Sequence, residues 1–285
     1  MSVAATELTG TRFVRRDALP GFGPTLGLTL FYLALLVLLP LSALFASASG
    51  EGLRHALAFV ATPRVLSAFR ISFGIALAAT LINGAAGLLI AWVLVRYDFP
   101  GRRFIDGIVD LPFALPTAVA GIALATLCAD TGWIGSLLAP FGIEVAYTPL
   151  GIFVALLFVG LPYVIRTVQP VLAELEVEAE EAAMTLGATS RQVFYRVLAR
   201  PLVPALLTGM AMAFARGVGE YGSVIFIAGN RSGVSEILPL LIVVKLEEFD
   251  YAGASVLAVA MLLVSAAVLL AINLVQSWER RSHGG

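Results

Sequence analysis

Four long apolar runs without a charged residue constrain the fold more than any other feature of this sequence. They are Leu26–Ala46, Ile71–Val95, Leu111–Cys128 and Ala252–Val275. A helix needs about 20 apolar residues, at about 1.5 Å each, to cross about 30 Å of hydrocarbon. Each run is close to this length, so each is predicted to be a membrane-spanning helix. A fifth and shorter run, Pro149–Ile165, spans when its flanks are included.

The region from Leu202 to Gly229 is less simple. Arg216 and Glu220 interrupt it, and three glycines crowd the interruption: Gly217, Gly219 and Gly222. We predict a helix over Leu202–Ala215 followed by bent or re-entrant backbone, which survives at membrane depth only where protein or a water-filled cavity surrounds it. The chain is thus predicted to be an all-α integral membrane protein with about six transmembrane helices. A count of five or seven is the alternative that this region leaves open.

Composition supports the membrane assignment and excludes some partners. The chain is 59% hydrophobic and only 13% charged, which leaves too little polar surface to coat a soluble globule of this size. The net charge of -1 and the lack of a basic stripe exclude a nucleic-acid partner. Cys128 and the two distant histidines, His55 and His283, provide neither a disulfide nor a metal site.

The distribution of Lys and Arg predicts the orientation of the chain. The alternate segments that include both termini carry about twice as many of these residues as the other set, so both termini are predicted to be cytoplasmic. The predicted organisation is a cytoplasmic segment 1–25, a transmembrane domain 26–276 and a cytoplasmic tail 277–285. The first apolar run begins too late and is too long for a cleavable signal, so it is expected to remain as a span.

One cytoplasmic loop, residues 171–200, is acidic yet patterned as two short helices. Its glutamates gather towards the start of the first helix, where the helix dipole favours negative charge: Glu174, Glu176, Glu178, Glu180 and Glu181. Gly187 stands where a C-terminal helix glycine is expected. Thr189 with Gln192 forms a capping-box pattern that starts the second helix.

Small residues form one predicted face of the first helix in this loop. Ala179, Ala182, Ala183 and Leu186 fall at the i, i+3, i+4, i+7 spacing. A narrow face ringed by glutamates suits a groove on a partner protein better than it suits lipid. Periodicity alone leaves two interpretations open, a helix that docks on a partner and a helix that only connects two spans.

The same loop resembles the EAA loop of ABC importer permeases. The resemblance lies in Glu181-Ala182-Ala183, then Gly187 after three residues, then Val197 after nine more. In that family the loop is the coupling helix that docks on the ATP-binding subunit. The resemblance implies this role for Ala182, Ala183 and Gly187, with Glu181 as the polar anchor.

The end of the loop departs from the family pattern. Ala199-Arg200 stands where Leu-Pro is expected, and Pro201 comes one place later. The departure falls where the following span begins.

A second stretch resembles the T-type membrane subunit of bacterial sulfate/thiosulfate importers. It reads Arg216-Gly-Val-Gly-Glu220-Tyr-Gly-Ser-Val-Ile-Phe-Ile-Ala-Gly-Asn230, followed by Lys245-Leu-Glu-Glu-Phe-Asp-Tyr251, within a resemblance that runs from Ile71 to Gln276. It implies a bacterial inner-membrane importer made of this chain, a paralogous second permease, two copies of a cytoplasmic ATP-binding subunit and a periplasmic or lipid-anchored sulfate-binding protein. Molybdate and tungstate permeases look similar, so a related oxyanion is the alternative substrate.

The sequence contains no G-x-x-x-x-G-K-[ST] phosphate-binding loop. The chain is therefore predicted to be no enzyme and to bind no cofactor, with ATP and Mg²⁺ bound by the partner ATPase subunits. The implied mechanism is alternating access, which requires that nucleotide bind one conformation better than the other.

An anion pathway needs positive potential without tight binding, and Arg216 is the candidate that supplies it. The predicted pathway group also includes Gly217, Gly219, Glu220 and Tyr221. Backbone amides of a glycine cluster can hold an oxyanion. Glu220 lies one turn after Arg216, however, and a purely structural ion pair between them is the open alternative.

Two other classes of function fit the sequence less well. A membrane-embedded enzyme needs a nucleophile, base or metal ligands that converge at membrane depth, and we find no histidines, cysteines or paired carboxylates so placed. An ion-driven secondary transporter predicts inverted repeats and broken helices in both halves. The sequence shows a clear break only in the second half.

Overall fold

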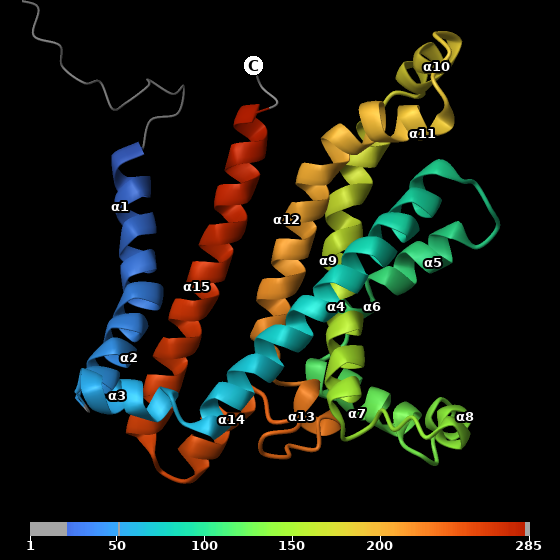
Figure 1. The fold of residues 1–285 in the computed structure, drawn as a ribbon. Coiled ribbons are helices and arrows are strands. Elements are labelled where there is room, and N and C mark those ends of the chain that lie inside the picture. The colour runs from blue at the N-terminus through green and yellow to red at the C-terminus, as the bar shows by residue number, and fades with distance from the viewer. Residues whose placement is uncertain (1–21, 51, 283–285) are drawn as a thin grey trace, which may run out of the picture. The chain divides into compact units, whose positions relative to one another are not determined.

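The computed structural model describes residues 22–50 and 52–282, and this part of the chain is helical, without a strand (Figure 1). Most of the predicted N-terminal segment and the last residues of the predicted tail lie outside it. The chain divides into two compact units, residues 1–46 and 47–285.

The first unit contains one continuous apolar helix. It comprises α1 (Phe22–Leu33), a π-helical turn (Ala34–Leu38) and most of α2 (Leu39–Ser49). The π turn lies just before Pro40, which has no N–H to donate within the helix. The wider turn accommodates this loss, because the Leu39 N–H donates to the carbonyl of Ala34.

The second unit contains the remaining helices. They are α3 (Leu53–Val60), α4 (Pro63–Arg96), α5 (Arg102–Val109), α6 (Leu111–Ala114), α7 (Thr117–Cys128), α8 (Gly135–Leu138), a 3₁₀ turn (Ala139–Phe141), α9 (Pro149–Glu174), α10 (Val177–Thr185), α11 (Ser190–Val193), a π turn (Phe194–Leu198), α12 (Ala199–Val218), α13 (Val224–Ile227), α14 (Leu238–Glu247) and α15 (Tyr251–Ser282).

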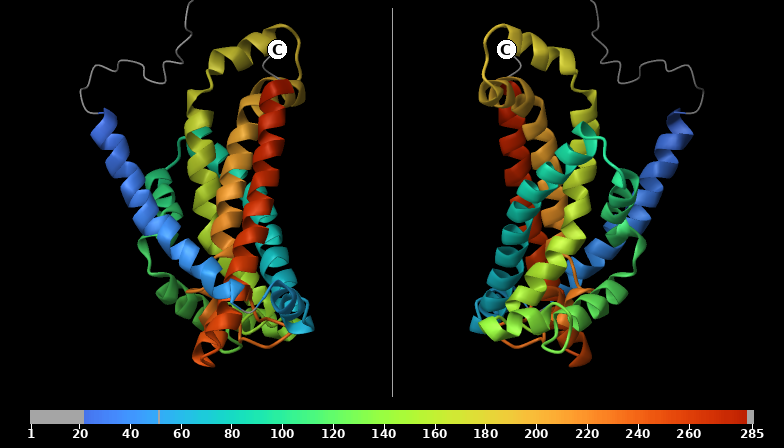
Figure 2. Two further views of the ribbon diagram at one scale, coloured as in Figure 1. Left: turned by 90° about the vertical axis from the view of Figure 1, so that its left-hand side faces the viewer. Right: turned by 90° about the vertical axis from the view of Figure 1, so that its right-hand side faces the viewer.

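Helices α4, α9 and α12 form the centre of this unit and pack against each other, with α4 crossing the other two obliquely (Figures 1 and 2). Glycines allow their backbones to approach closely. A Cβ on Gly87 of α4 would lie 2.7 Å from Val164 Cγ1 of α9, and a Cβ on Gly209 of α12 would lie 2.9 Å from Val164 Cα. Both helices therefore close on α9 at the same residue. The buried Asn83 adds a weak polar contact, donating over 3.5 Å to the Leu156 carbonyl.

The predicted span Leu111–Cys128 is not one helix. It is divided between α6 and α7, with Leu115 and Pro116 in extended backbone between them. The cause is local, because a proline disfavours helical backbone at the residue before it. The first half therefore also contains a broken apolar segment, whereas the sequence predicted a clear break only in the second half.

The break after α12 follows the prediction in kind but not in position. The helix continues to Val218, beyond the predicted end at Ala215, and the chain resumes as the short α13. Between them, a Cβ on Gly222 would lie 2.2 Å from Thr117 Oγ1, and a Cβ on Gly121 of α7 would lie 2.4 Å from the Ser223 carbonyl oxygen. The two broken segments therefore pack backbone against backbone.

Five helices in the described residues are long and apolar enough to cross a membrane. They are Phe22–Ser49, Pro63–Arg96, Pro149–Glu174, Ser190–Val218 and Tyr251–Ile272. The apolar helix α7 is shorter, because it is only one piece of the divided segment Leu111–Cys128. In the second unit, α10 and α11 lie at one end of the bundle, and α8, α13 and α14 lie at the other (Figure 1).

Candidate functional site

The acidic loop folds into a helical hairpin whose first helix, α10, begins later than predicted. Glu174 is the last residue of α9, and Glu176 is the N-cap residue of α10. Glu178 and Glu180 remain in the first turn, where the positive end of the helix dipole stabilises carboxylates. The acidic cluster is thus divided between the end of one helix and the start of the next.

Gly187 ends α10 in the way that its position predicted. Its φ of +85° is a left-handed conformation that L side chains rarely adopt. The Gly187 N–H donates to the Met184 carbonyl over 2.9 Å, and the Ala188 N–H donates to the Ala183 carbonyl over 3.1 Å. These two bonds form a Schellman motif. No atom lies near a Cβ built on Gly187, so backbone conformation alone favours glycine here.

The predicted capping box starts the second arm of the hairpin. The Thr189 N–H donates to Gln192 Oε1 over 2.8 Å, and the Gln192 N–H donates to Thr189 Oγ1 over 3.4 Å. The helix then passes through the π turn Phe194–Leu198 and continues as α12. As in the first unit, the π turn precedes a proline, here Pro201.

The small-residue face of α10 is divided in the structure. Ala179 and Ala182 are exposed, as is Glu181, whereas Ala183 is half-buried and packs against the core. Leu186 lies just past the end of the helix and is 89% exposed. The exposed surface of the hairpin thus combines small residues, a carboxylate and a large apolar side chain at its tip.

Glu180 turns towards the protein, which the sequence analysis did not predict. Its side chain pairs with Arg96, the last residue of α4, at 2.5 Å, and both side chains are largely buried. The Arg96 guanidinium also lies over the Trp92 ring, 5.7 Å from its centroid. The sequence signal was a single arginine at the end of a long apolar run, which carries no information about its partner.

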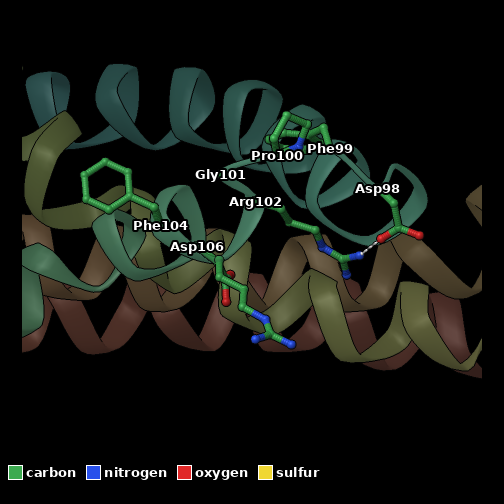
Figure 3. Close-up of a pocket in the computed structure, with 8 residues that line it drawn as sticks. Asp98, Phe99, Pro100, Gly101, Arg102, Phe104 and Asp106 are labelled. Carbon is green, nitrogen blue, oxygen red and sulfur yellow. Dashed lines mark hydrogen bonds and ion pairs between the residues drawn. The ribbon is translucent and has the colours of Figure 1, made fainter.

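A hollow of about 950 Å³ lies beside the turn between α4 and α5, and Phe99, Pro100 and Phe104 help to line it (Figure 3). Arg102 reaches Asp98 across a distance of 2.5 Å. Asp98 is almost fully exposed, so water screens this pair and it contributes little to stability.

A charged cluster joins α5 to α9 near this hollow. Arg166 donates two hydrogen bonds to the carboxylate of Asp110, at 2.7 and 2.6 Å, and a third to Asp106 Oδ1 at 2.7 Å. Gln169 adds a hydrogen bond to the same oxygen of Asp106. This cluster fixes α5 and the start of α6 against the central helix α9.

The predicted pathway residues lie around the break after α12. Arg216 pairs with Glu220, whose side chain is buried, and Glu220 Oε1 accepts hydrogen bonds from the Ser223 N–H and hydroxyl at 2.9 and 2.8 Å. The structural ion pair is therefore present. The Gly219 N–H donates to the Ala215 carbonyl, and Gly217 lies within the helix. Tyr221 packs against a buried core cluster.

Polar contacts at the α13–α14 end hold the chain at the start of α14. Arg64 makes a bidentate pair with the buried Glu236, at 2.9 and 2.6 Å, and Ser72 Oγ accepts a hydrogen bond from the Leu238 N–H at 2.8 Å. These contacts tie the start of α4 to the segment before α14. No short sequence pattern predicts these pairings, because the partners are more than 160 positions apart.

Asp250 starts α15. Its Oδ1 accepts a hydrogen bond from the Gly253 N–H at 2.9 Å, and its Oδ2 lies 3.2 Å from Lys245 Nζ. The Gly253 hydrogen bond first, and Lys245 after it, lower the pKa of the Asp250 carboxyl below its ordinary value. A Cβ on Gly253 would lie 2.4 Å from Asp250 Oδ2, so a larger residue there would displace the capping carboxylate.

Comparison with known proteins gives consistent matches. Residues 83–281 match the family described as "Binding-protein-dependent transport system inner membrane component". The "Sulfate transport system permease protein CysT" of Synechocystis sp. is 51% identical over 253 residues, 89% of this chain and 88% of that protein. The protein of the same name from Escherichia coli is 48% identical over 262 residues, 92% of this chain and 95% of that protein.

Solved structures show the same fold at much lower identity. A chain of a bacterial ABC transporter that imports the acidic polysaccharide alginate aligns with a TM-score of 0.75 and 14% identity, covering 90% of this chain and 94% of that one. The MetNI methionine ABC transporter aligns with a TM-score of 0.53 and 18% identity, covering 78% of this chain and 98% of that one. With the family match and the two close relatives, this fold places the chain in the binding-protein-dependent transport system inner membrane component family, among the CysT-type ABC transporter permeases.

Proposed function

We propose that the chain is the membrane-spanning permease subunit of an ATP-driven importer of sulfate or thiosulfate that works by alternating access. The substrate follows from the relatives, whose names specify sulfate transport and which cover almost the whole chain. A related oxyanion such as molybdate is the second candidate, since it shares the tetrahedral dianionic chemistry.

The observation that carries the proposal is the presentation of α10 at one end of the bundle. A well-terminated helix that exposes Ala179, Ala182 and Leu186 towards solvent leaves apolar surface uncovered. Burying such surface on a partner contributes about 25 cal/mol per Å². We therefore assign α10 as the coupling helix, with Glu181, Ala182, Ala183 and Gly187 forming or shaping the surface that meets an ATP-binding subunit.

The proposed assembly contains this chain, a paralogous second permease, two cytoplasmic ATP-binding subunits and a periplasmic or lipid-anchored sulfate-binding protein. The family description, which names a binding-protein-dependent system of the inner membrane, supports the last of these. ATP and Mg²⁺ would bind to the partner subunits. Both termini and α10 would face the cytoplasm, which follows from the distribution of Lys and Arg.

The substrate pathway is proposed to pass the break after α12, near Arg216 and Tyr221. Arg216 is one-third exposed although its partner Glu220 is buried, so part of the guanidinium remains available to an anion. Because Glu220 already neutralises Arg216 in part, the site would attract a dianion without holding it tightly, as transport requires.

Uptake in cells tests the proposal. We expect that deletion of this chain abolishes growth on sulfate as sole sulfur source and abolishes uptake of ³⁵S-sulfate, and that the unmodified chain restores both. Competition with unlabelled thiosulfate and molybdate separates the two substrate candidates. Normal ³⁵S-sulfate uptake without the chain, in a strain that has no other sulfate importer, would contradict the proposal.

A further inference from the structure

Glu180 is the glutamate of α10 that turns inward, and we propose that its pair with Arg96 transmits the movement of α10 to α4. The inference rests on the proposed function, because it assumes that α10 receives an ATP-binding subunit. Glu178 and Glu181 on the same helix are exposed, whereas the side chains of Glu180 and Arg96 are only 17% and 15% exposed. Within the described residues, no other ion pair links α10 to the bundle.

The geometry of this pair makes it sensitive to small shifts. The two charged groups approach to 2.5 Å, yet Arg96 Nε, Arg96 Nη2 and Glu180 Oε1 are buried without an aligned hydrogen bond. Buried charges depend steeply on alignment, because water cannot replace a lost partner. A displacement of α10 by a fraction of an ångström therefore changes the energy of the contact and pulls or releases the end of α4.

Aromatic contacts bring the second arm of the hairpin to the same place. The Trp92 ring, one turn before Arg96, lies 6.0 Å from the Phe194 ring, measured between centroids. Arg96 in turn lies over Trp92. The end of α4 thus contacts α10 through Glu180 and the start of the following span through Phe194, so the hairpin holds α4 from both arms.

The other end of α4 contacts the segment between α13 and α14, and this contact can carry a movement of α10 across the bundle. The helix is 34 residues long, about 50 Å at about 1.5 Å per residue. At its far end, Arg64 holds the buried Glu236, and Ser67 donates to the Gly233 carbonyl over 3.2 Å. That irregular segment lies between α13 and α14, at the end of the bundle opposite to α10 (Figure 1). A rigid α4 can therefore pass a movement of α10 to the segment between α13 and α14.

Charge exchange in the complete importer tests the inference. The assembled complex, with its second permease and ATP-binding subunits, is reconstituted in proteoliposomes with the sulfate-loaded binding protein. ³⁵S-sulfate uptake and ATP hydrolysis are measured together. We expect Arg96→Glu and Glu180→Arg each to lower uptake per ATP hydrolysed about tenfold, while binding-protein-stimulated hydrolysis continues. The exchange variant with both substitutions should recover most of the loss, because the pair is restored with reversed polarity.

Matched controls separate this role from general damage. The exposed Arg102–Asp98 pair lies next along the chain, at the turn between α4 and α5 (Figure 3), and its reversal should leave uptake per ATP unchanged. Glu180→Gln keeps the shape of the side chain but removes its charge, so it should also uncouple the importer. It provides the test if the Glu180→Arg complex fails to assemble. Uptake per ATP within about twofold of the unmodified complex in Glu180→Gln, or no recovery in the exchange variant, would overturn the inference. Failure of the unmodified complex to transport sulfate would instead overturn the proposed function.

Discussion

At the residue scale, a few positions fix the shape of the helical hairpin formed by α10 and α11. Gly187 supplies the left-handed turn that ends α10, and the Thr189–Gln192 box starts the next helix two residues later. Between them they set the angle between α10 and the helix that follows it. Such positions act through backbone conformation, so their substitution should alter docking without affecting the membrane-embedded core.

Gly187→Pro should abolish uptake although the chain still inserts. Proline fixes φ near −65°, far from the +85° that this position adopts. Gly187→Asn is the matched control, because asparagine tolerates left-handed backbone better than other residues, and it should retain most uptake. Wild-type ³⁵S-sulfate uptake by the proline variant, at equal membrane abundance, would contradict the role of this turn.

Asp250→Ala should lower the free energy of unfolding of the chain by about 1 kcal/mol at pH 7, since an N-cap residue is lost. The pKa of Asp250 is lowered in the folded state, so the ionised cap stabilises the protein above the unfolded pKa near 3.9. This contribution is lost as pH falls below that value, through the lower folded pKa.

Thermal unfolding in detergent between pH 7 and pH 3 measures this effect. The difference between wild type and Asp250→Ala should shrink below about pH 4. Asp250→Asn, which still caps, should stay closer to wild type at pH 7. A difference between wild type and Asp250→Ala that does not depend on pH would show that the charge of Asp250 contributes nothing to the cap.

At the element scale, prolines and glycines shape the spans. Pro116 divides the apolar segment Leu111–Cys128, and π turns precede Pro40 and Pro201. The late position of Pro201 relative to the EAA pattern coincides with the π turn at Phe194–Leu198. A π turn takes one more residue per hydrogen-bonded turn than an α-helix, so it accommodates the one-residue difference at the start of α12.

Two glycines in the break after α12 should respond differently to the same substitution. A Cβ on Gly222 would collide with Thr117, whereas a Cβ on Gly219 would meet only the Ala215 carbonyl at 3.8 Å. Gly222→Ala should therefore destabilise the packing of α13 on α7 by about 1–3 kcal/mol, and Gly219→Ala should be tolerated. Thermal stability of the two purified variants distinguishes them, and equal values would contradict the described contact.

The sequence predicted local features well because they depend on residues close together in the chain. The Gly187 turn, the Thr189 capping box and the break after α12 all arise from short patterns. The pairing of Arg96 with Glu180 was missed, because a single arginine or glutamate does not specify which helix it will face. The split of Leu111–Cys128 was missed for another reason, since hydropathy counted apolar residues and did not weigh Pro116.

At the scale of the whole molecule, α4 connects the two ends of the second unit. It packs centrally against α9 and α12, contacts α10 through Arg96 and holds the segment before α14 through Arg64. Helix α4 is continuous between the two ends, as is α9, whereas α5–α7 and α12–α13 are broken. This arrangement suits the proposed alternating-access mechanism, in which a movement of α10 at one end of the unit is coupled to a change at the other end.

Site-specific crosslinking tests whether α10 is the cytoplasmic docking surface for an ATP-binding subunit. In a Cys128→Ser background, Ala182→Cys should crosslink to that subunit in intact membranes and should resist impermeant thiol reagents added from outside. Leu137→Cys in α8, at the opposite end and 71% exposed, is the control and should react from outside. Labelling of Ala182→Cys from outside, or no crosslink to the ATP-binding subunit in an actively transporting complex, would contradict the account.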